Sequence, residues 1–338
     1  VAADVSYKHF GWQKDGSFLI GTNIIGAERE TTPHLQGVAR DYEETLTQKG
    51  DLDTWVNATR LFDLKGMEFQ GFCFLLSLGA PLQKAAGFPS ALVNMYSKDS
   101  GSGKTLTGRF GLSAWGDYRT LGATTKSTPA AFYKHFGTLS NFGVYVDEMT
   151  TMDTDRLRSF VMSIQDGVEP IRLSASAAGF RDASRWCTPI ITSSNTDMYA
   201  QLGQTVVTEA EELRILQFNC ERVAYLADNG MQVGRKLQKL IEENYGLAGP
   251  IFVEDLIERG GPEAVFNPIY DEFDDVFNFK MPGQERFYKG KIVVAYAAGK
   301  LYTELGLIKF DYKRHIRAVL KHILKLRKNR SANVSDGF

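Results

Sequence analysis

The six residues SGSGKT, Ser100 to Thr105, constrain the fold of this chain more than any other stretch of its sequence. They follow the apolar run ALVNMY, a predicted strand, and precede LTGRFGLSAWG, a predicted helix. Small residues allow successive backbone N–H groups to turn toward an anion, which the start of the following helix also faces. The sequence therefore predicts a strand, a phosphate-binding loop and a helix in that order.

The loop also has the two polar groups that a nucleotide site needs. Lys104 can reach the outer phosphates of ATP, and the hydroxyl of Thr105 can bind Mg²⁺. The usual pattern G-x-x-x-x-G-K-[ST] has a glycine where this chain has Lys98, but the two later glycines can still form the turn. The alternative is a Gly/Ser loop that happens to precede Lys-Thr. We assign ATP to the loop residues Ser100, Gly101, Ser102, Gly103, Lys104, Thr105 and Leu106.

Two further predicted strands end in polar side chains. FGVYV ends in Asp147, which can bind Mg²⁺ through its water shell, and Glu148, which can orient the attacking water. Acids at strand ends also cap helices, which is the alternative interpretation. CTPIITSSN ends in Asn195, whose amide can hydrogen-bond the γ-phosphate or the water, or simply form an Asx-turn. Together with the loop, these two strand ends predict an ATPase.

Between residues 89 and 220, short apolar runs rich in β-branched or aromatic residues alternate with helical stretches. Such runs are typical of buried strands in a parallel sheet, so we predict an α/β fold, a P-loop NTPase core flanked by helices. YDEFDDVFNF, in the last third of the chain, is predicted to be a loop-rich acidic insertion. The predicted units are a strand-rich region at 1–50, a helical collar-like segment at 51–88, the ATPase core at 89–220, and a mainly helical region at 221–338.

The composition limits the partners that we expect. The 338 residues include 39 Lys and Arg and 40 Asp and Glu, so a nucleic-acid partner has to be attracted by local patches. The three cysteines are far apart and form no metal-ligand pattern, which fits a reduced, cytoplasmic setting without zinc. No apolar run is long enough to span a bilayer and no signal peptide is visible, so we expect no membrane partner.

The order of SGSGKT, VYVDE and PIITSSN resembles that of the superfamily-three helicases, AAA+-like motors of viruses and mobile elements. The lead-in FGW…FLIG, Trp115 and the late segment RFYKGKIVVAYAAGKLYTELGL resemble a related group of phage and plasmid replicative helicase domains. The resemblance covers residues 10–310. It implies an ATP-dependent helicase or translocase that acts on single-stranded DNA as a homo-oligomer, a hexameric ring. The group often has a primase or polymerase module ahead of the motor, and a start at Val1 fits a piece of such a longer protein.

The same resemblance implies that Asn195 is a sensor and that an arginine of the neighbouring subunit completes each ATP site. Arg214 in EELRILQFN stands at the family's position, with Arg222 as the reserve candidate. An arginine there can neutralise charge that develops on the γ-phosphate. The alternative is that Arg214 pairs with the adjacent Glu211 or Glu212. By a weaker match, Arg286 corresponds to a second arginine sensor.

Between the acidic pair and Asn195, PIRLSASAAGFRDASRWC alternates around a glycine-containing centre, which predicts a β-hairpin. In the family, a hairpin here projects into the pore of the ring and grips single-stranded DNA, although its tip usually has a lysine. The alternative is that the arginines pair with neighbouring acids. The candidate DNA-binding residues are Arg172, Arg181 and Arg185 for phosphates and Phe180 for base stacking.

The segment KFDYKRHIRAVLKHILKLRKNR, residues 309–330, predicts an amphipathic helix with a strongly basic face. Such a face can hold nucleic acid, or it can be a solvated face that balances the acids of residues 271–275. Both interpretations stay open, and a membrane surface is a weaker third.

Two other functions use the same nucleotide motifs. An AAA+-type loader or initiator would hydrolyse ATP to remodel a replication complex without unwinding DNA. A small-molecule P-loop kinase would need a substrate-binding lid, and it would leave Asn195 and Arg214 without an obvious role.

Overall fold

At the centre of the protein is a five-stranded sheet in which all neighbouring strands run parallel, in the order β10-β6-β9-β8-β7. This arrangement confirms the predicted α/β class. The computed structural model describes residues 6–28, 32–88, 90–124, 127–170, 182–203 and 213–335. The strands of the central sheet are β6 (Ser90–Tyr96), β7 (Ala123–Thr124), β8 (Val144–Asp147), β9 (Thr188–Ser194) and β10 (Ile215–Asn219).

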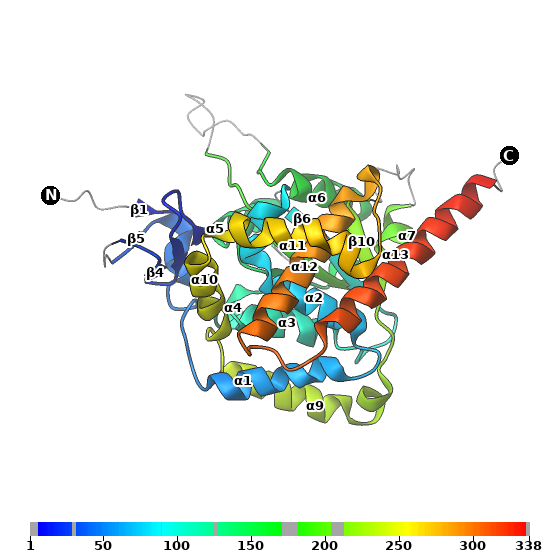
Figure 1. The fold of residues 1–338 in the computed structure, drawn as a ribbon, viewed down its shortest axis with the longest axis horizontal. Helices are drawn as coiled ribbons and strands as arrows, with labels where there is room; N and C mark the ends of the chain where they lie inside the picture. The colour runs from blue at the N-terminus through cyan, green and yellow to red at the C-terminus, as the bar shows by residue number, and fades with distance from the viewer. Residues whose placement is uncertain are drawn as a thin grey trace.

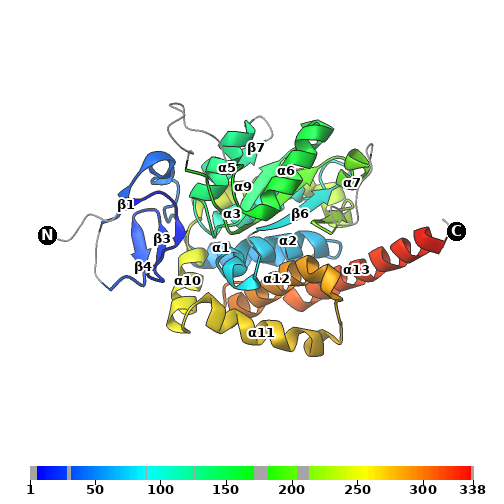
Figure 2. The same ribbon diagram turned by 90° about the horizontal axis from the view of Figure 1, so that it is seen from above.

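The two strands in the middle of the sheet, β6 and β9, are buried along nearly their whole length. A parallel sheet is covered on both faces, which is why its strands are near-continuous runs of apolar or small residues. Figure 2 shows the covering helices α6 (Thr154–Asp166) and α2 (Glu68–Leu78) on opposite sides of β6. The apolar runs that predicted these strands are therefore explained by the helices that cover both faces of the sheet.

The helices form the remaining bulk of the molecule (Figure 1). Helix α2 is buried from Gln70 to Leu78 and packs against α3, α12 and α13, so it joins the C-terminal helices to the sheet. The other α-helices are α1 (Leu52–Ala58), α3 (Lys104–Ser113), α4 (Tyr118–Leu121), α5 (Pro129–Thr138), α7 (Met198–Leu202), α9 (Ala224–Glu243), α10 (Ala248–Glu258), α11 (Pro262–Phe277), α12 (Arg286–Glu304) and α13 (Tyr312–Ser335). Short 3-10 helices are η1 (Gly37–Tyr42), η2 (Thr59–Asp63), η3 (Ala80–Ala86), η4 (Met149–Thr151) and η5 (Gly283–Glu285).

The N-terminal region contains the short strands that the glycine-punctuated sequence predicts, at the blue end of the ribbon in Figure 1. Its attachment to the core is aromatic: the ring of Phe18 stacks on Trp115, and the indole N–H of Trp12 donates to the carbonyl of Pro81 at 2.8 Å. β1 (Ser6–Tyr7) pairs in parallel with β5 (His34–Leu35), and an antiparallel sheet is formed by β2 (Gly11–Trp12), β3 (Phe18–Ile20) and β4 (Asn23–Ile25).

The acidic segment YDEFDDVFNF is helical, so the predicted loop-rich insertion is wrong. It lies mainly in α11, which ends at Phe277. Phe266, Ile269 and Phe273 recur at helical spacing and are buried, and this apolar period outweighs the cluster of acids between them. Two of those acids form ion pairs with lysines of α12: Asp274 with Lys289 at 3.0 Å and Glu272 with Lys300 at 2.8 Å.

The basic C-terminal segment forms a helix as predicted, α13. Its apolar side chains Ile316, Val319 and Ile323 are fully buried, and the helix packs against α2 and α12. Over the part of the chain that the structure describes, no helix is both long enough and apolar enough to cross a membrane.

Alanine substitutions at two helical glycines should change the free energy of unfolding in opposite directions. A Cβ atom at Gly108 in α3 would lie 2.2 Å from the ring of Tyr145, whereas one at Gly234 in α9 would meet no atom within 4 Å. We expect Gly108→Ala to lower the free energy of unfolding by about 1–3 kcal/mol, because the core is overpacked. Gly234→Ala should raise it by up to about 1 kcal/mol, because alanine favours helix. Urea denaturation of both variants checks this, and a loss of stability in Gly234→Ala would contradict it.

Candidate nucleotide-binding site

The loop SGSGKT lies between the carboxyl end of β6 and the start of α3. Gly101 and Gly103 have φ angles of +80° and +83°, a left-handed conformation that glycine adopts without a steric penalty. Lys98, at the place of the missing first glycine, is not among the described non-glycine residues with positive φ. The departure from the usual pattern therefore puts no strain on the loop.

The first turn of α3 is open toward the loop. Gly103 is its N-cap and supplies no side-chain hydrogen bond, so backbone N–H groups at this helix start are available to an anion. Lys104 is only 8% exposed, and its ammonium donates to the carbonyl of Ser97 and the hydroxyl of Ser102, both at 3.3 Å. Burial lowers the pKa of Lys104. A bound polyphosphate would act in the opposite direction, because its negative charge stabilises the charged form of the lysine.

Asp147 is the centre of a hydrogen-bond network at the end of β8. Its Oδ1 accepts from the hydroxyl of Tyr145 at 2.8 Å, the hydroxyl of Ser193 at 2.5 Å and the N–H of Glu148 at 3.1 Å. The hydroxyl of Thr105 is 3.5 Å from the same oxygen. These donors fix the rotamer of Asp147, so the carboxylate and the Thr105 hydroxyl form an oxygen-rich pair suited to Mg²⁺.

Glu148 has an unusual backbone conformation. Its φ and ψ are 60° and 47°, in the left-handed region, where a non-glycine residue costs about 1–3 kcal/mol. Its side chain is exposed and lines the same pocket as the phosphate-binding loop. Strain of this kind is retained where the surroundings impose it, and here it turns the chain from β8 into η4 directly beside the loop.

One pocket of about 340 Å³ contains the predicted nucleotide and catalytic residues except Arg214. Asn195 is part of it, and its backbone N–H donates to the hydroxyl of Thr150 at 2.6 Å, which fixes the chain after β9. The predicted residues that line this pocket are Ser100, Gly101, Ser102, Gly103, Lys104, Thr105, Leu106, Asp147, Glu148 and Asn195.

The sequence interpretation missed several residues of the site. Tyr145 was assigned only as an apolar strand residue, and Ser193 only as part of a polar strand end, yet both hold Asp147. Gln70 in α2 donates to the carbonyl of Ser102 at 2.8 Å and so holds the loop from beneath. Gly230 and Gly234 in α9 also line the pocket. Two glycines one helical turn apart indicate a helix face without side chains, which the sequence could have revealed. Nothing in the sequence around Gln70 indicates its role.

Arg214 lies at the end of the sheet where its parallel strands begin. It immediately precedes β10, and because β10 runs parallel to β6, this is the edge opposite to the phosphate-binding loop. Two donors fix its carbonyl oxygen: the side-chain amide of Gln165 at 3.1 Å and the fully buried ammonium of Lys291 at 2.7 Å. Arg214 is therefore remote from its own chain's pocket, so the finger role requires a neighbouring subunit and stays a prediction.

The other predicted arginines also lie outside the pocket. Arg222 follows β10 at the carboxyl edge of the sheet, and the guanidinium of Arg286, at the start of α12, lies 4.8 Å from the centre of the Phe287 ring. Glu211 and Glu212, the alternative partners of Arg214, lie outside the described residues.

Most of the predicted pore hairpin, including Arg172, Phe180 and Arg181, lies outside the described residues. Its base is antiparallel, as a hairpin requires: the N–H of Glu169 donates to the carbonyl of Ser184 at 2.8 Å, beside a bridge between Val168 and Arg185.

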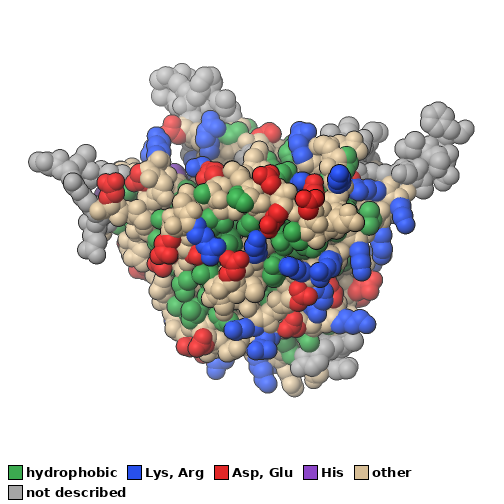
Figure 3. All heavy atoms as spheres, in the orientation of Figure 1, with side chains coloured by type: hydrophobic (Ala, Val, Ile, Leu, Met, Phe, Trp, Pro, Cys, Tyr) green, Lys and Arg blue, Asp and Glu red, His purple; other side chains and the backbone are tan. Residues whose placement is uncertain are grey.

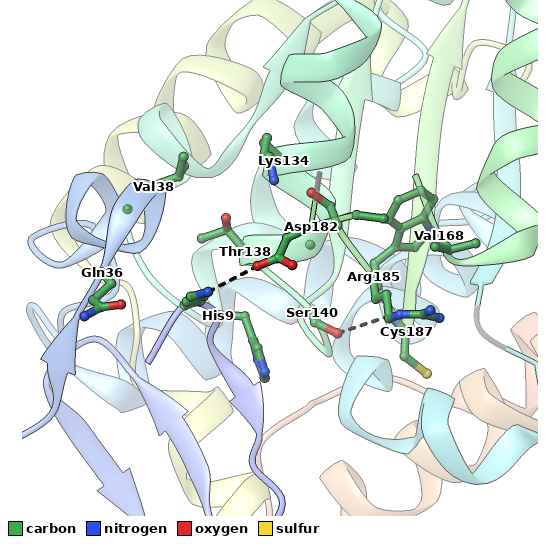
Figure 4. Close-up of a pocket in the computed structure, with 16 residues that line it drawn as sticks. His9, Gln36, Val38, Lys134, Thr138, Ser140, Val168, Asp182, Arg185 and Cys187 are labelled. Carbon is green, nitrogen blue, oxygen red and sulfur yellow. Dashed lines mark hydrogen bonds and ion pairs between the residues drawn. The ribbon is translucent and has the colours of Figure 1, made fainter. Parts of the chain in front are cut away.

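Arg185 is exposed and lines a second, larger cleft of about 1100 Å³. Lys134 lines the same cleft (Figure 4), as do Lys8 and Asp182, which form an ion pair at 3.4 Å. Both partners of this pair are largely exposed, so it contributes little to stability. The charged side chains that line the cleft are three cations, Lys8, Lys134 and Arg185, and one acid, Asp182, which pairs with Lys8.

The left-handed backbone of Glu148 predicts a difference in stability between two variants. Glu148→Ala keeps the strain and Glu148→Gly relieves it, so we expect the glycine variant to be more stable by about 1 kcal/mol. Chemical denaturation of the two proteins measures the difference. Equal stability would contradict the assignment of strain at this residue.

Comparison with solved structures identifies a protein of similar fold, described as "SCCmec type IV Cch - active helicase". The two share 16% sequence identity and a TM-score of 0.72, over 96% of this chain and 60% of that one, so this chain spans about three-fifths of its length. Weaker matches are NtrX from Brucella abortus with ADP (14% identity, TM-score 0.27, 72% of this chain and 67% of that one) and an inhibitor-bound JCV helicase (11%, 0.32, 71% and 66%). These two TM-scores are too low to support a structural argument.

No curated protein matches the sequence. A family described as "Domain of unknown function (DUF927)" matches residues 2–184, which is more than half of the chain. The matched part includes the N-terminal strands, the phosphate-binding loop and the acidic pair, and it ends before β9. The chain therefore belongs to the DUF927 family.

Proposed function

We propose that this chain is the motor of an ATP-dependent DNA helicase or translocase of the superfamily-three type, acting on single-stranded DNA in the replication of a phage or similar mobile element. The observation that carries the proposal is the convergence of Lys104, the pair Asp147 and Glu148, and Asn195 in one pocket at the carboxyl edge of the sheet. The fold shared with an active helicase supports it.

The proposed chemistry is positioning and charge stabilisation. The loop N–H groups and Lys104 would bind the phosphates, and Thr105 and Asp147 would hold Mg²⁺, which when bound would neutralise phosphate charge. Glu148 orients the attacking water, and Asn195 contacts the water or the γ-phosphate. Tyr145 and Ser193 act through Asp147, because their hydroxyls fix its orientation.

We propose further that the protein works as a ring in which Arg214 of one subunit completes the site of the next. The support is its position at the amino edge of the sheet, together with the two hydrogen bonds from Gln165 and Lys291 that fix its backbone. The guanidinium itself donates to the sulfur of Met162 at 3.2 Å, a contact that it would exchange for the γ-phosphate of the neighbouring subunit. Single-stranded DNA would contact the predicted hairpin, which follows the bridge between Val168 and Arg185, so that hydrolysis moves the strand.

The two lysines of the phosphate-binding loop provide a matched test of the ATP site. Lys104→Ala should abolish ATP binding and hydrolysis, whereas Lys98→Ala should retain both, because Lys98 does not line the pocket. Glu148→Gln should bind ATP with near-normal affinity and hydrolyse it about 100-fold more slowly or worse. Nucleotide binding and phosphate release measure these effects. Full activity in Lys104→Ala would rule out the proposed site.

Single-stranded DNA should stimulate hydrolysis by the wild-type protein, and a forked duplex should release its displaced strand. A rate of ATP hydrolysis that does not change when DNA is added would count against the proposed translocase. Stimulated hydrolysis without strand release would instead favour the loader or initiator, which uses the same pocket.

Mixing two inactive variants tests the role of Arg214. Arg214→Ala should bind ATP and hydrolyse it about 1,000-fold more slowly. The Glu148→Gln subunit still offers Arg214 to its neighbour. Mixed rings therefore contain interfaces at which Arg214 of one subunit meets Glu148 of the next. The ATPase activity of the mixture should exceed the sum of the activities of the separate proteins. Arg119→Ala, which removes an exposed partner of Asp117, is the control and should remain active alone. No recovery on mixing would argue against a trans arginine.

A further inference from the structure

Helix α13 has a row of basic side chains along its solvent side. Residues four apart on an α-helix share a face and are about 6 Å apart along its axis. Within the described part of the chain, none of these side chains forms an ion pair. Figure 3 shows Lys and Arg side chains gathered over α13. We call this row the basic stripe; it consists of Lys313, Arg317, Lys321, Lys325 and Lys328.

Two other basic residues of the same helix have structural roles. Arg314 donates to the carbonyls of Phe62 at 2.6 Å and Asp63 at 2.9 Å, where η2 ends. Arg327 forms an ion pair at 2.6 Å with Glu285, which is only 1% exposed. The helix thus separates its cations into two sets, one that holds the fold together and one, the basic stripe, that faces outward.

The basic stripe is unfavourable for the isolated protein. Like charges at i and i+4 repel each other, and solvated helix faces usually place acids between their cations. Two other helices here do so: α9 pairs Lys239 with Glu243, and α10 pairs Asp255 with Arg259. From Tyr312 to Lys328, α13 contains no acid. A bound polyanion would remove this repulsion, so charge complementarity indicates a polyanionic partner.

The surroundings of the helix decide which polyanion fits. A helix that lies on a lipid surface inserts its apolar face, but here Ile316, Val319 and Ile323 are fully buried in the core. Sites for single-stranded nucleic acid combine cations with aromatic rings on which bases stack. Between Lys313 and Lys328 the helix contains no Phe, Tyr or Trp, and Tyr312, at its start, packs against the ring of Tyr296 with the ammonium of Lys313 at 6.0 Å from its own ring centre. A duplex, in contrast, presents regularly spaced phosphates and keeps its bases inside.

We propose that the basic stripe of α13 binds the phosphate backbone of duplex DNA. The contact is independent of base sequence, because it involves phosphates only. It is also separate from the nucleotide pocket, which contains no residue of α13. In a motor that unwinds DNA, as proposed above, such a surface holds the parental duplex while single-stranded DNA occupies the predicted hairpin.

The test is duplex binding by the full chain without nucleotide. Lys321→Glu/Lys325→Glu reverses two charges in the middle of the basic stripe, and Arg235→Glu/Lys236→Glu on α9, at two exposed cations outside the ion pairs of the described structure, is the matched control. Anisotropy of a labelled duplex over a salt series gives the affinity and its salt dependence. We expect the stripe variant to lose about tenfold or more in affinity at low salt, and its salt slope to fall by about two.

Three controls separate this outcome from others. The melting temperature of the stripe variant should equal or exceed that of wild type, because an acid four residues after Arg317 relieves repulsion. Its affinity for single-stranded DNA should change less than its affinity for duplex. Glu148→Gln should bind duplex like wild type, so failure of the proposed ATPase leaves this test intact.

Unchanged duplex binding in the stripe variant, or an equal loss in the α9 control, would overturn the proposal. So would a change in oligomeric state at unchanged duplex affinity, since the basic stripe would then contact a second copy of the chain. An equal loss for single-stranded and duplex DNA would overturn the assignment to duplex.

Discussion

Parallel pairing of β6, β8 and β9 is the constraint on which the candidate site depends. Because these strands run in the same direction, their carboxyl ends meet at one edge of the sheet, where α/β proteins bind ligands. The loop after β6, the acids after β8 and Asn195 after β9 reach one pocket from segments far apart in sequence. No long side chain has to span the gap between them, since the backbone register already brings them together.

Helix α2 has a comparable role for the rest of the molecule. It is buried almost throughout, touches α3, α12 and α13, and holds the phosphate-binding loop through Gln70. A shift of this helix would change the loop and the C-terminal helices together, because its fully buried side chains leave it no independent freedom. The nucleotide pocket and α13, which have no residue in common, are thus joined through one rigid element.

Much of the fold and of the nucleotide pocket could be predicted, because the relevant residues have local signals. Gly101, Lys104 and Asp147 stand next to apolar strands, and strand ends are where such residues do chemistry. Tyr145 and Gln70 could not be found in this way. Their roles arise from contacts across the sheet and between helices, and a tyrosine in a strand or a glutamine in a helix is unremarkable locally.

The incorrect expectation at YDEFDDVFNF has a related cause. Its acids suggested a solvated loop, whereas the spacing of Phe266, Ile269 and Phe273 determined a helix that packs on α12. The expectation gave more weight to the cluster of acidic residues than to the helical spacing of the apolar ones. On α13 the same two signals agree, since an apolar face and a basic face alternate with helical spacing, and the helix was predicted correctly.

The placement of Arg214 and the nucleotide pocket on opposite edges of one sheet has a consequence for symmetry. In a two-fold dimer residue i contacts residue j and j contacts i, so such a dimer would join the amino end of each sheet to the carboxyl end of the other and leave neither end for a third copy. A heterologous, head-to-tail contact instead leaves one Arg214 and one pocket of every pair free for further copies. Repetition of such a contact yields a closed cycle when the rotation per subunit divides a full turn, and an open helical filament when it does not.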